Sequence, residues 1–438
     1  MPYSLSQRLG FLTQLEKLLD ERRLAIEAAL ASDFRKAPFE VMTSEIAMVR
    51  HEIRAVKTAA RSFLGTKSIG VPVSLWPGRA TVIREPRGRV LVLAPWNFPF
   101  QLALVPLVGA VAAGNVVVLK PSELTPATAA VVDDLVRRTF PEDLVTVVQG
   151  GADVATLLLK EKWGLIFFTG SPAVGKIVAR AAAETLSPTI LELGGKSPAV
   201  VFEGADFPTA ARRIVWGKVM NAGQTCVAPD YVLVPRGRID EFVAACGRVL
   251  TTFFPRGAAH SDDFPALIHE RAFDRLTALI DPAHVALGGQ SDRSRLFLEP
   301  TVLTGLTWSH PAMAQEIFGP VLPILAHDGP EDALAQVLRS PDPLAAYAFG
   351  RPTEARWFLA SFRAGGGMVN DVVTHFSHPG LPFGGLHTSG TGQYHGRWSL
   401  EAFTRPRGQL SQPRRWDWPF RYPPYGGIKA KLVDFLLR

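Results

Sequence analysis

The chain has 438 residues, of which 47% are apolar and 20% are charged, a composition typical of a soluble globular protein of two or three domain-sized units. Its two cysteines exclude a disulfide framework and fit a reducing compartment. The net charge of +7 is scattered apart from a basic cluster at 405–421, and no nucleic-acid-binding motif accompanies it, so we expect no nucleic-acid partner.

The first 64 residues predict helices without a leader sequence. Residues 5–64 have helical periodicity with mixed charge, and an interruption near Pro38 divides them into two or three helices. Arg8, Glu16 and Lys17 interrupt every candidate apolar core of a signal peptide. We therefore expect a cytoplasmic protein.

Strand patterns begin at about residue 71. Residues 71–84 show short β-like alternations broken by prolines, and from Val90 onward short apolar strands alternate with helical stretches. The predicted strands are 90–93, 116–119, 144–148 and 165–168, and the helices between them are 102–113, 127–140 and 152–159. This pattern predicts an α/β fold with a doubly wound parallel sheet, in which ligands bind beyond the carboxyl ends of the strands.

One stretch of this region resembles a membrane span. Residues 101–119 carry no charge and are long enough to cross a bilayer. Pro106, Gly109 and Gly114 interrupt the stretch, so a buried helix followed by a buried strand explains it better. We expect no integral membrane segment.

Polar residues follow the first two strands of the predicted sheet. Asn97, between Trp96 and Phe98, is a rigid N–H donor suited to an oxyanion, although a structural Asn in a turn gives the same pattern. Lys120 and Glu123 can bond ribose hydroxyls, and a glutamate there repels a 2′-phosphate. The alternative is a strand end capped by polar residues.

The fourth strand leads into a possible phosphate site. Thr169, Gly170 and Ser171 connect this strand to a helix start, which offers N–H donors and a positive dipole end to a phosphate. The three-glycine dinucleotide fingerprint is absent, so an ordinary turn also satisfies the pattern.

Glu192 is a candidate general base. It lies between Leu191 and Leu193, and apolar surroundings disfavour the charged carboxylate and raise its pKa. The alternative is a surface ion pair with Lys196.

A second α/β region begins near Gly194 and contains the candidate nucleophile. Cys226 ends the run Asn-Ala-Gly-Gln-Thr-Cys, where Gly223 allows a tight loop with amide groups directed at whatever the sulfur attacks. An inert buried cysteine is the alternative, and that reading suits Cys246. Farther along, Glu316 and Phe318 precede a turn and offer a carboxylate and a ring. The predicted helices of this region are 207–220, 239–253, 272–280, 333–338, 353–362 and 428–437.

In this order, the motifs of the chain resemble those of the aldehyde dehydrogenase superfamily over nearly its whole length. The similar segments are 95–97, 120–123, 168–171, 192–196, 223–226 and 316–320. Residues 382–396 and 421–425 resemble the class 3 branch, and 227–235 resemble the bacterial members that include coniferyl aldehyde dehydrogenase. Phe98 departs from the tyrosine that is common in class 3.

The resemblance implies a role for each matching residue. Cys226 would attack the aldehyde, Asn97 would hold the oxyanion, and Glu192 would activate the water that hydrolyses the thioester. NAD is the implied cofactor, with NADP possible, and no metal is expected. The implied cofactor-binding residues are Lys120, Glu123, Thr169, Gly170, Ser171, Gly194, Glu316 and Phe318.

The resemblance also implies a domain organisation. The expected units are a Rossmann-type NAD(P)-binding domain at 1–68 and 87–193, an α/β catalytic domain at 194–402, oligomerisation strands at 69–86 and 403–420, and a tail helix at 421–438. The oligomerisation strands imply a homodimer.

The expected reaction is NAD(P)-dependent oxidation of a hydrophobic aldehyde, aromatic or phenylpropenal such as coniferyl aldehyde, to the acid. A medium- or long-chain aliphatic aldehyde is the alternative substrate. An acyl-CoA reductase fits less well, because water activated by Glu192 would compete with CoA for the thioester. A cofactor-free cysteine hydrolase lacks a convincing histidine partner, and the intact Asn97, Glu192 and Cys226 set argues against a non-catalytic NAD-binding protein.

Overall fold

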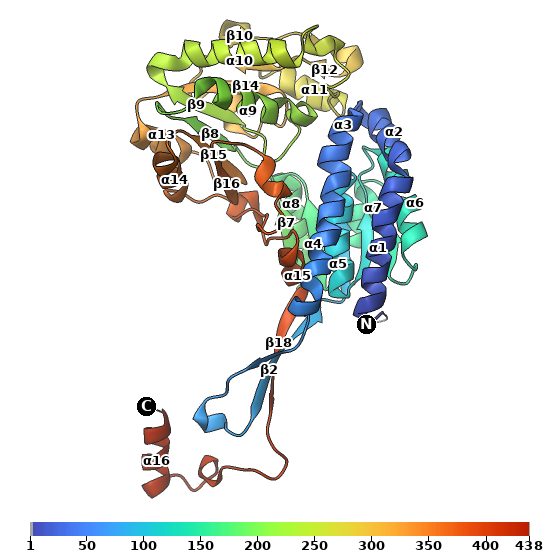
Figure 1. The fold of residues 1–438 in the computed structure, drawn as a ribbon, viewed down its shortest axis with the longest axis vertical. Helices are drawn as coiled ribbons and strands as arrows, with labels where there is room; N and C mark the ends of the chain where they lie inside the picture. Colours follow the sequence, from blue (N-terminus) through green and yellow to red (C-terminus); the bar gives the residue numbers. More distant parts are fainter. Residues whose placement is uncertain (1–2, 438) are drawn as a thin grey trace.

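Two α/β bodies and a protruding arm make up the computed structural model, which describes residues 3–437 (Figure 1). The first body contains a parallel sheet in the order β7-β6-β3-β4-β5, with β17 antiparallel at its edge beside β7. Its strands are β3 (Arg89–Leu93), β4 (Val116–Lys120), β5 (Val145–Val147), β6 (Leu165–Thr169), β7 (Thr189–Glu192) and β17 (Gly390–Thr391). From β3 the chain adds β4 and β5 on one side, and it then returns to add β6 and β7 on the other side of β3. The connections leave β3 and β6 in opposite directions, and this switch creates a crevice for ligands.

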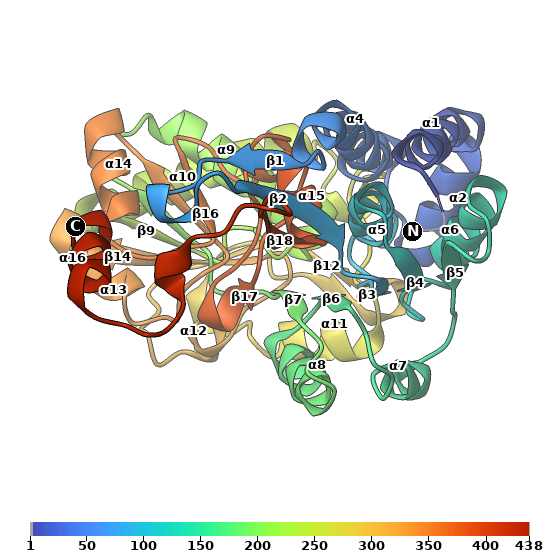
Figure 2. The same ribbon diagram turned by 90° about the horizontal axis from the view of Figure 1, so that it is seen from below.

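Alternating residues of these strands pack against helices on both faces of the sheet. Val90 and Val92 face the layer of α1, α2, α4, α5 and α6, whereas Leu91 and Leu93 face α7 and α8 (Figure 2). The helices are α1 (Leu5–Glu21), α2 (Arg23–Phe34), α3 (Pro38–Val41), the π-helix η1 (Met42–Ile46), α4 (Ala47–Phe63), α5 (Gln101–Ala113), α6 (Pro126–Thr139), α7 (Ala152–Leu158) and α8 (Pro172–Glu184). Two buried faces explain why the strands are almost wholly apolar.

The stretch that resembles a membrane span is a core helix and a core strand. Every residue of α5 is buried, and β4 follows it as an inner strand of the sheet, between β3 and β5. Gly109 permits the close packing of α5, because a side-chain carbon there would lie 2.6 Å from Cβ of Ser399. Within residues 3–437, no helix combines the length and apolar character needed to cross a membrane.

The second body is built on a seven-stranded sheet in the order β10-β13-β14-β9-β8-β15-β16, parallel except for β10. Its strands are β8 (Pro198–Val201), β9 (Tyr231–Pro235), β10 (Val285–Leu287), β13 (Thr301–Leu303), β14 (Val321–His327), β15 (Ala345–Phe349) and β16 (Gly366–Val369). The helices are α9 (Phe207–Val219), α10 (Ile239–Phe253), α11 (Glu270–Thr277), α12 (Pro311–Ala314), α13 (Pro330–Val337) and α14 (Pro352–Ala360), and α15 (Arg397–Ala402) follows them in the chain. A small hairpin joins β11 (Ser291–Asp292) to β12 (Phe297–Leu298).

The arm is an antiparallel sheet in the order β1-β2-β18 that extends away from both bodies (Figure 1). It consists of β1 (Lys67–Ile69), β2 (Arg79–Pro86) and β18 (Thr404–Ser411), and the chain beyond it ends in α16 (Gly427–Leu437). Nearly all of β18 is exposed.

The structure confirms the predicted α/β class and the predicted strands and helices between Val90 and Phe168, each within one residue at both ends. It adds one pairing that the sequence did not indicate. Residues 390–391, which we expected in the catalytic unit, form β17 and pair with β7 of the first sheet. Helix α15 likewise packs on α4 and α5 of the first body.

Candidate active site

A large cavity lies beyond the carboxyl ends of β6 and β7, between the two bodies. Its volume is about 830 Å³. We call it the outer cavity, and the predicted site residues that line it are Asn97, Thr169, Gly170, Ser171, Glu192, Gly194, Cys226, Glu316 and Phe318. The fold thus brings together residues from five separate stretches of the sequence, at 97, 169–171, 192–194, 226 and 316–318.

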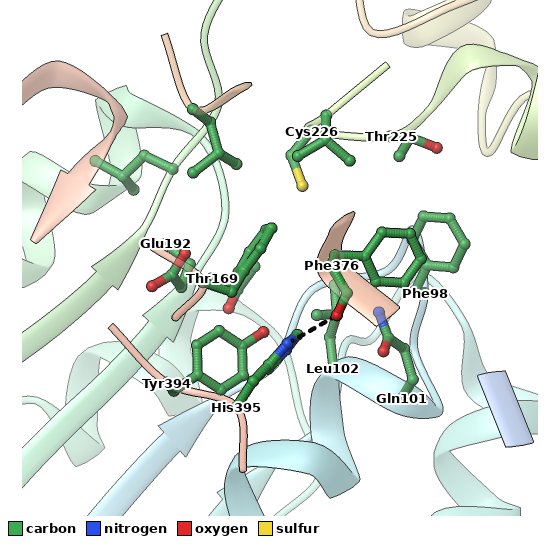
Figure 3. A pocket seen from close by; sticks show the side chains of 14 residues that line it. Phe98, Gln101, Leu102, Thr169, Glu192, Thr225, Cys226, Phe376, Tyr394 and His395 are labelled. Carbon is green, nitrogen blue, oxygen red and sulfur yellow. Dashed lines mark hydrogen bonds between the residues drawn. The ribbon is translucent and has the colours of Figure 1, made fainter. Parts of the chain in front are cut away.

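A smaller inner cavity, of about 30 Å³, adjoins the outer one (Figure 3). It is lined by Phe98, Gln101, Leu102, Thr169, Glu192, Leu193, Thr225, Cys226, Val227, Leu344, Phe376, Phe383, Tyr394 and His395. The two cavities share Thr169, Glu192, Leu193 and Cys226. A molecule in either cavity therefore meets the sulfur of Cys226.

The loop before Cys226 is an unusually tight one. Asn221 and Ala222 have φ angles of 52° and 51°, and Gly223 follows with φ of 73°. A side-chain carbon at Gly223 would lie 2.3 Å from the carbonyl oxygen of Gly319, so only glycine fits there. Non-glycine residues in this backbone region are uncommon and occur often at functional sites.

The thiol of Cys226 is half-buried and lies near two carboxyl groups. Burial raises the pKa of Cys226, and the charges of Glu316 and Glu192 raise it further. The thiol is therefore protonated at neutral pH, and positive charge in the outer cavity would favour the thiolate.

Asn97 is fixed against the cysteine loop. Its side-chain Nδ2 donates to the carbonyl oxygen of Gln224 at 3.1 Å, and its own carbonyl oxygen accepts from Nδ2 of Asn221 at 2.8 Å. The side chain is almost fully buried. An amide has a second N–H, so Asn97 can also donate to an oxygen beside Cys226.

Glu192 is a buried carboxyl group without a partner. It ends β7, is 2% exposed, and neither of its side-chain oxygens has a hydrogen-bond partner. Burial holds its pKa well above the ordinary value. The alternative of a surface pair with Lys196 is wrong, because Lys196 forms a buried ion pair with Asp230 instead.

That ion pair holds the backbone on both sides of Glu316. Lys196 donates to the carbonyl oxygen of Gln315 at 3.0 Å, and Asp230 accepts from the N–H of Ile317 at 2.8 Å. Burial and Asp230 raise the pKa of Glu316 to about 8. Sequence analysis assigned no role to Asp230, because only the fold places it beside this loop.

The carboxyl group of Glu316 packs directly against the backbone of Gly194, which has no side chain. A side-chain carbon at Gly194 would lie 1.9 Å from Oε2 of Glu316, so a larger residue there would displace the carboxylate. Nearby, the rings of Phe318 and Trp96 meet edge to face, with their centres 5.5 Å apart. A carboxylate, glycine backbone and aromatic rings on one wall suit a flat ring attached to a ribose.

The N-terminus of α8 lines another part of the outer cavity. Ser171 caps this helix by accepting from the N–H of Val174 at 3.4 Å, and Gly170 and Pro172 line the cavity beside it. The dipole and the free N–H groups of a helix start bind phosphate groups. The outer cavity thus fits a dinucleotide.

Lys120 and Glu123 lie at the same sheet edge but do not line either cavity. They form an ion pair at 2.7 Å, in which Lys120 is the last residue of β4 and Glu123 follows the strand. Although partial burial acts in the opposite direction, the hydrogen bond from Lys120 lowers the pKa of Glu123 and keeps it charged.

The inner cavity contains polar atoms that the sequence analysis did not single out. The side-chain oxygen of Gln101, the hydroxyl of Tyr394 and Nε2 of His395 are buried without partners. His395 donates from Nδ1 to the carbonyl oxygen of Phe376 at 3.0 Å, and burial lowers its pKa to about 4, so Nε2 is an acceptor. Tyr394 and His395 lie in a motif recognised from the sequence, but only the fold places them in the wall of the cavity that Cys226 also lines (Figure 3).

Comparison with known proteins gives a consistent result. Residues 2–408 match the model of the aldehyde dehydrogenase family. The chain is 38% identical over 432 residues to 4,4'-diaponeurosporen-aldehyde dehydrogenase of Staphylococcus aureus, covering 98% of this chain and 94% of that protein. It is 41% identical over 436 residues to a probable coniferyl aldehyde dehydrogenase of Pseudomonas aeruginosa, covering 98% and 91%.

Solved structures show the same fold. The substrate-bound state of Staphylococcus aureus AldH superposes with a TM-score of 0.96 at 37% identity, over 99% of this chain and 95% of that chain. An aldehyde dehydrogenase of Mycobacterium tuberculosis complexed with NAD+ superposes with a TM-score of 0.85 at 30% identity, over 95% and 87%.

Proposed function

Because this chain belongs to the aldehyde dehydrogenase family, we propose that it oxidises a hydrophobic aldehyde, aromatic or phenylpropenal, to the carboxylic acid with NAD(P) as cofactor. The observation that carries the proposal is the position of Cys226, Glu192 and Thr169 where the two cavities meet. In this arrangement the outer cavity holds the cofactor, and the inner cavity, which is smaller than an aromatic aldehyde in this structure, widens around the aldehyde as it binds.

The residues divide the reaction into two steps. The sulfur of Cys226 bonds to the aldehyde carbon, and the amide of Asn97 and the N–H of Cys226 stabilise the oxyanion of the thiohemiacetal. Oxidised NAD(P), when bound, would supply a positively charged ring that favours the thiolate and an acceptor for the hydride that leaves the thiohemiacetal carbon as the thioester forms. Glu192 then takes a proton from water, and the hydroxide breaks the thioester to release the acid and free Cys226.

The cofactor-binding roles follow from position. We propose that Gly170, Ser171 and the start of α8 hold the pyrophosphate and that Glu316 holds the nicotinamide ribose, with Thr169, Gly194 and Phe318 lining the nicotinamide ring. Lys120 and Glu123, at the same sheet edge, would hold the adenosine ribose. The charge on Glu123 repels a 2′-phosphate, which favours NAD over NADP.

The inner cavity favours an aromatic aldehyde that carries a hydroxyl. Its walls are rich in phenylalanine, and Gln101 and His395 offer unpartnered acceptors. A phenolic O–H can donate to such an acceptor, whereas an alkanal leaves it unpaired. A medium- or long-chain alkanal remains the second candidate, because most of the lining is apolar and the Staphylococcus relative is named for a long polyene aldehyde.

We expect coniferaldehyde to be oxidised with a higher kcat/KM than benzaldehyde, hexanal or a long-chain alkanal, and more efficiently with NAD+ than with NADP+. Acid formation should be followed by chromatography, because conjugated aldehydes absorb where NADH does. Gln101→Leu is expected to lower kcat/KM for coniferaldehyde about tenfold, the effect of losing one hydrogen bond, and to leave hexanal almost unchanged.

Two results would contradict this assignment. Equal losses for coniferaldehyde and hexanal in Gln101→Leu would mean that Gln101 shapes the cavity without recognising a hydroxyl. Product formed only when CoA is added would favour an acyl-CoA reductase instead.

We also propose a homodimer joined through the arm. The free edge of β18 and exposed apolar side chains, among them Trp76 and Leu410, suit a second copy of the chain. Sedimentation equilibrium should give twice the mass of the chain, and Leu410→Asp should weaken the dimer. Leu24→Asp, an exposed position on α2 away from the arm, is the matched control, and a monomeric parent protein would refute the proposal.

The cytoplasm is the location that we propose. Both cysteines are free, and Cys226 must stay reduced to act as a nucleophile.

A further inference from the structure

A buried ion pair lies behind the loop that carries Asn97. The side chains of Lys36 and Glu45 have no exposed surface, and Nζ of Lys36 lies 2.7 Å from Oε1 of Glu45. Lys36 lies between α2 and α3, and Glu45 lies in the π-helix η1. Neither residue lines the outer or the inner cavity, so neither touches a molecule bound in them.

The pair contacts both ends of the Asn97 loop. Nζ of Lys36 donates to the carbonyl oxygen of Asn97 at 3.4 Å, and Oε2 of Glu45 accepts from the N–H of Gln101 at 2.8 Å. Gln101 begins α5, where a free N–H and the helix dipole favour a carboxylate. Lys36 also lies 4.1 Å from the ring centre of Phe98, so it contacts the middle of the loop as well.

The opposite side of Asn97 is held by the cysteine loop. Nδ2 of Asn221 and Nζ of Lys36 donate to the same carbonyl oxygen of Asn97, from two different parts of the chain. The side chain of Asn97 reaches in turn to the carbonyl oxygen of Gln224. The direction of the Asn97 amide therefore depends on the ion pair on one side and on the cysteine loop on the other.

A buried ion pair is not needed for stability alone, because apolar residues of similar volume often replace such pairs without loss. The π-helix that carries Glu45 is a rare element that is frequent at functional sites. We propose that Lys36 and Glu45 are positioning residues that aim the Asn97 amide at the carbonyl oxygen of the bound aldehyde. This inference rests on the proposed role of Asn97 as the oxyanion donor.

The test is a double-mutant cycle on the acylation step. The acylation rate is measured as the rate at which NADH forms in the first turnover of the enzyme, after rapid mixing with NAD+ and a saturating aldehyde. Loss of an oxyanion donor slows a reaction by about 10²- to 10³-fold, so Asn97→Ala should fall in that range. Glu45→Gln should slow acylation about tenfold in the parent protein and less than about twofold in the Asn97→Ala background, because its effect passes through Asn97.

The matched control removes a buried charge at the other end of the same helix. Arg8 donates from Nη1 to the carbonyl oxygen of Ala112, near the end of α5, and is also buried. Arg8→Met should destabilise the fold without changing the acylation rate. Binding of NAD+ should be unchanged in every variant.

The combined variant Lys36→Met/Glu45→Gln covers the case in which Glu45→Gln alone does not fold, because it removes both charges of the ion pair together. We expect its melting temperature to be close to that of the parent and its acylation to stay slow. A parent-like acylation rate in this folded variant would overturn the proposal.

The outcomes separate this inference from the proposed function. If Asn97→Ala itself acylates at the parent rate, the oxyanion role of Asn97 is wrong. If Asn97→Ala is slow but Glu45→Gln slows it a further tenfold, Asn97 keeps its role and the positioning role of the ion pair is wrong.

Discussion

Replacing Cys226 by alanine is expected to lower kcat by about 10⁴-fold or more and to leave the affinity for NAD+ unchanged. No other residue of the two cavities carries a thiol, and the covalent thioester route requires one. Cys226 contributes only part of the wall of the outer cavity, so the cofactor keeps its other contacts. Acid formation by chromatography and NAD+ binding by calorimetry measure the two effects separately.

The second cysteine of the chain provides the control. Cys246 lies in α10, is fully buried, and lines neither described cavity. Cys246→Ala should lower the melting temperature by leaving a small void while kcat stays close to the parent value. Oxidation that survives in Cys226→Ala would remove the thiol from the mechanism.

Replacing Glu192 by glutamine is expected to slow steady-state turnover by about 10²- to 10⁴-fold, the usual contribution of a general base. Thioester hydrolysis should slow more than acylation, because only hydrolysis needs a proton taken from water. The first turnover should then release NADH in a burst before the slow steady state. Rapid mixing with absorbance or fluorescence detection of NADH separates the two phases.

The pH profile gives a second readout of the same variant. Burial raises the pKa of Glu192, and a base acts in its deprotonated form, so deacylation in the parent should rise with pH until that pKa is passed. Glutamine does not titrate, so Glu192→Gln should lose this rise.

Glu52 provides the matched carboxyl group for this prediction. It is buried, its pKa is raised to about 7 by burial, and it accepts from Ser399 at 2.5 Å outside both cavities. Glu52→Gln should keep both the turnover and the rising limb. A burst no larger than in the parent, despite slower turnover of Glu192→Gln, would count against Glu192 as the deacylation base.

Several features could be predicted from the sequence because they depend only on residues that are neighbours in the chain. The alternation of apolar strands and helices from Val90 predicted the parallel sheet, because buried strands and amphipathic helices have different periods. The leucines on both sides of Glu192 predicted a carboxyl group in apolar surroundings, and the structure shows its two oxygens without partners.

Contacts between residues far apart in the sequence could not be predicted in this way. Lys196 lies four residues after Glu192, yet its partner is Asp230, which immediately precedes β9 of the second sheet. Lys120 and Glu123 follow a strand as predicted but lie away from the cavity wall, because β4 is separated from β6 by β3.

By itself, the sequence determined the fold class, the family and the candidate residues Cys226, Glu192 and Asn97, because each of these depends on periodicity or on a short motif. Only the tertiary structure decided which polar atoms face the substrate and which ion pairs hold the loops. Gln101 and His395, for example, are nearly 300 residues apart in the chain and line the same cavity. Burial and hydrogen bonding act through space, so their effect on a side chain is set only when the two bodies have folded against each other.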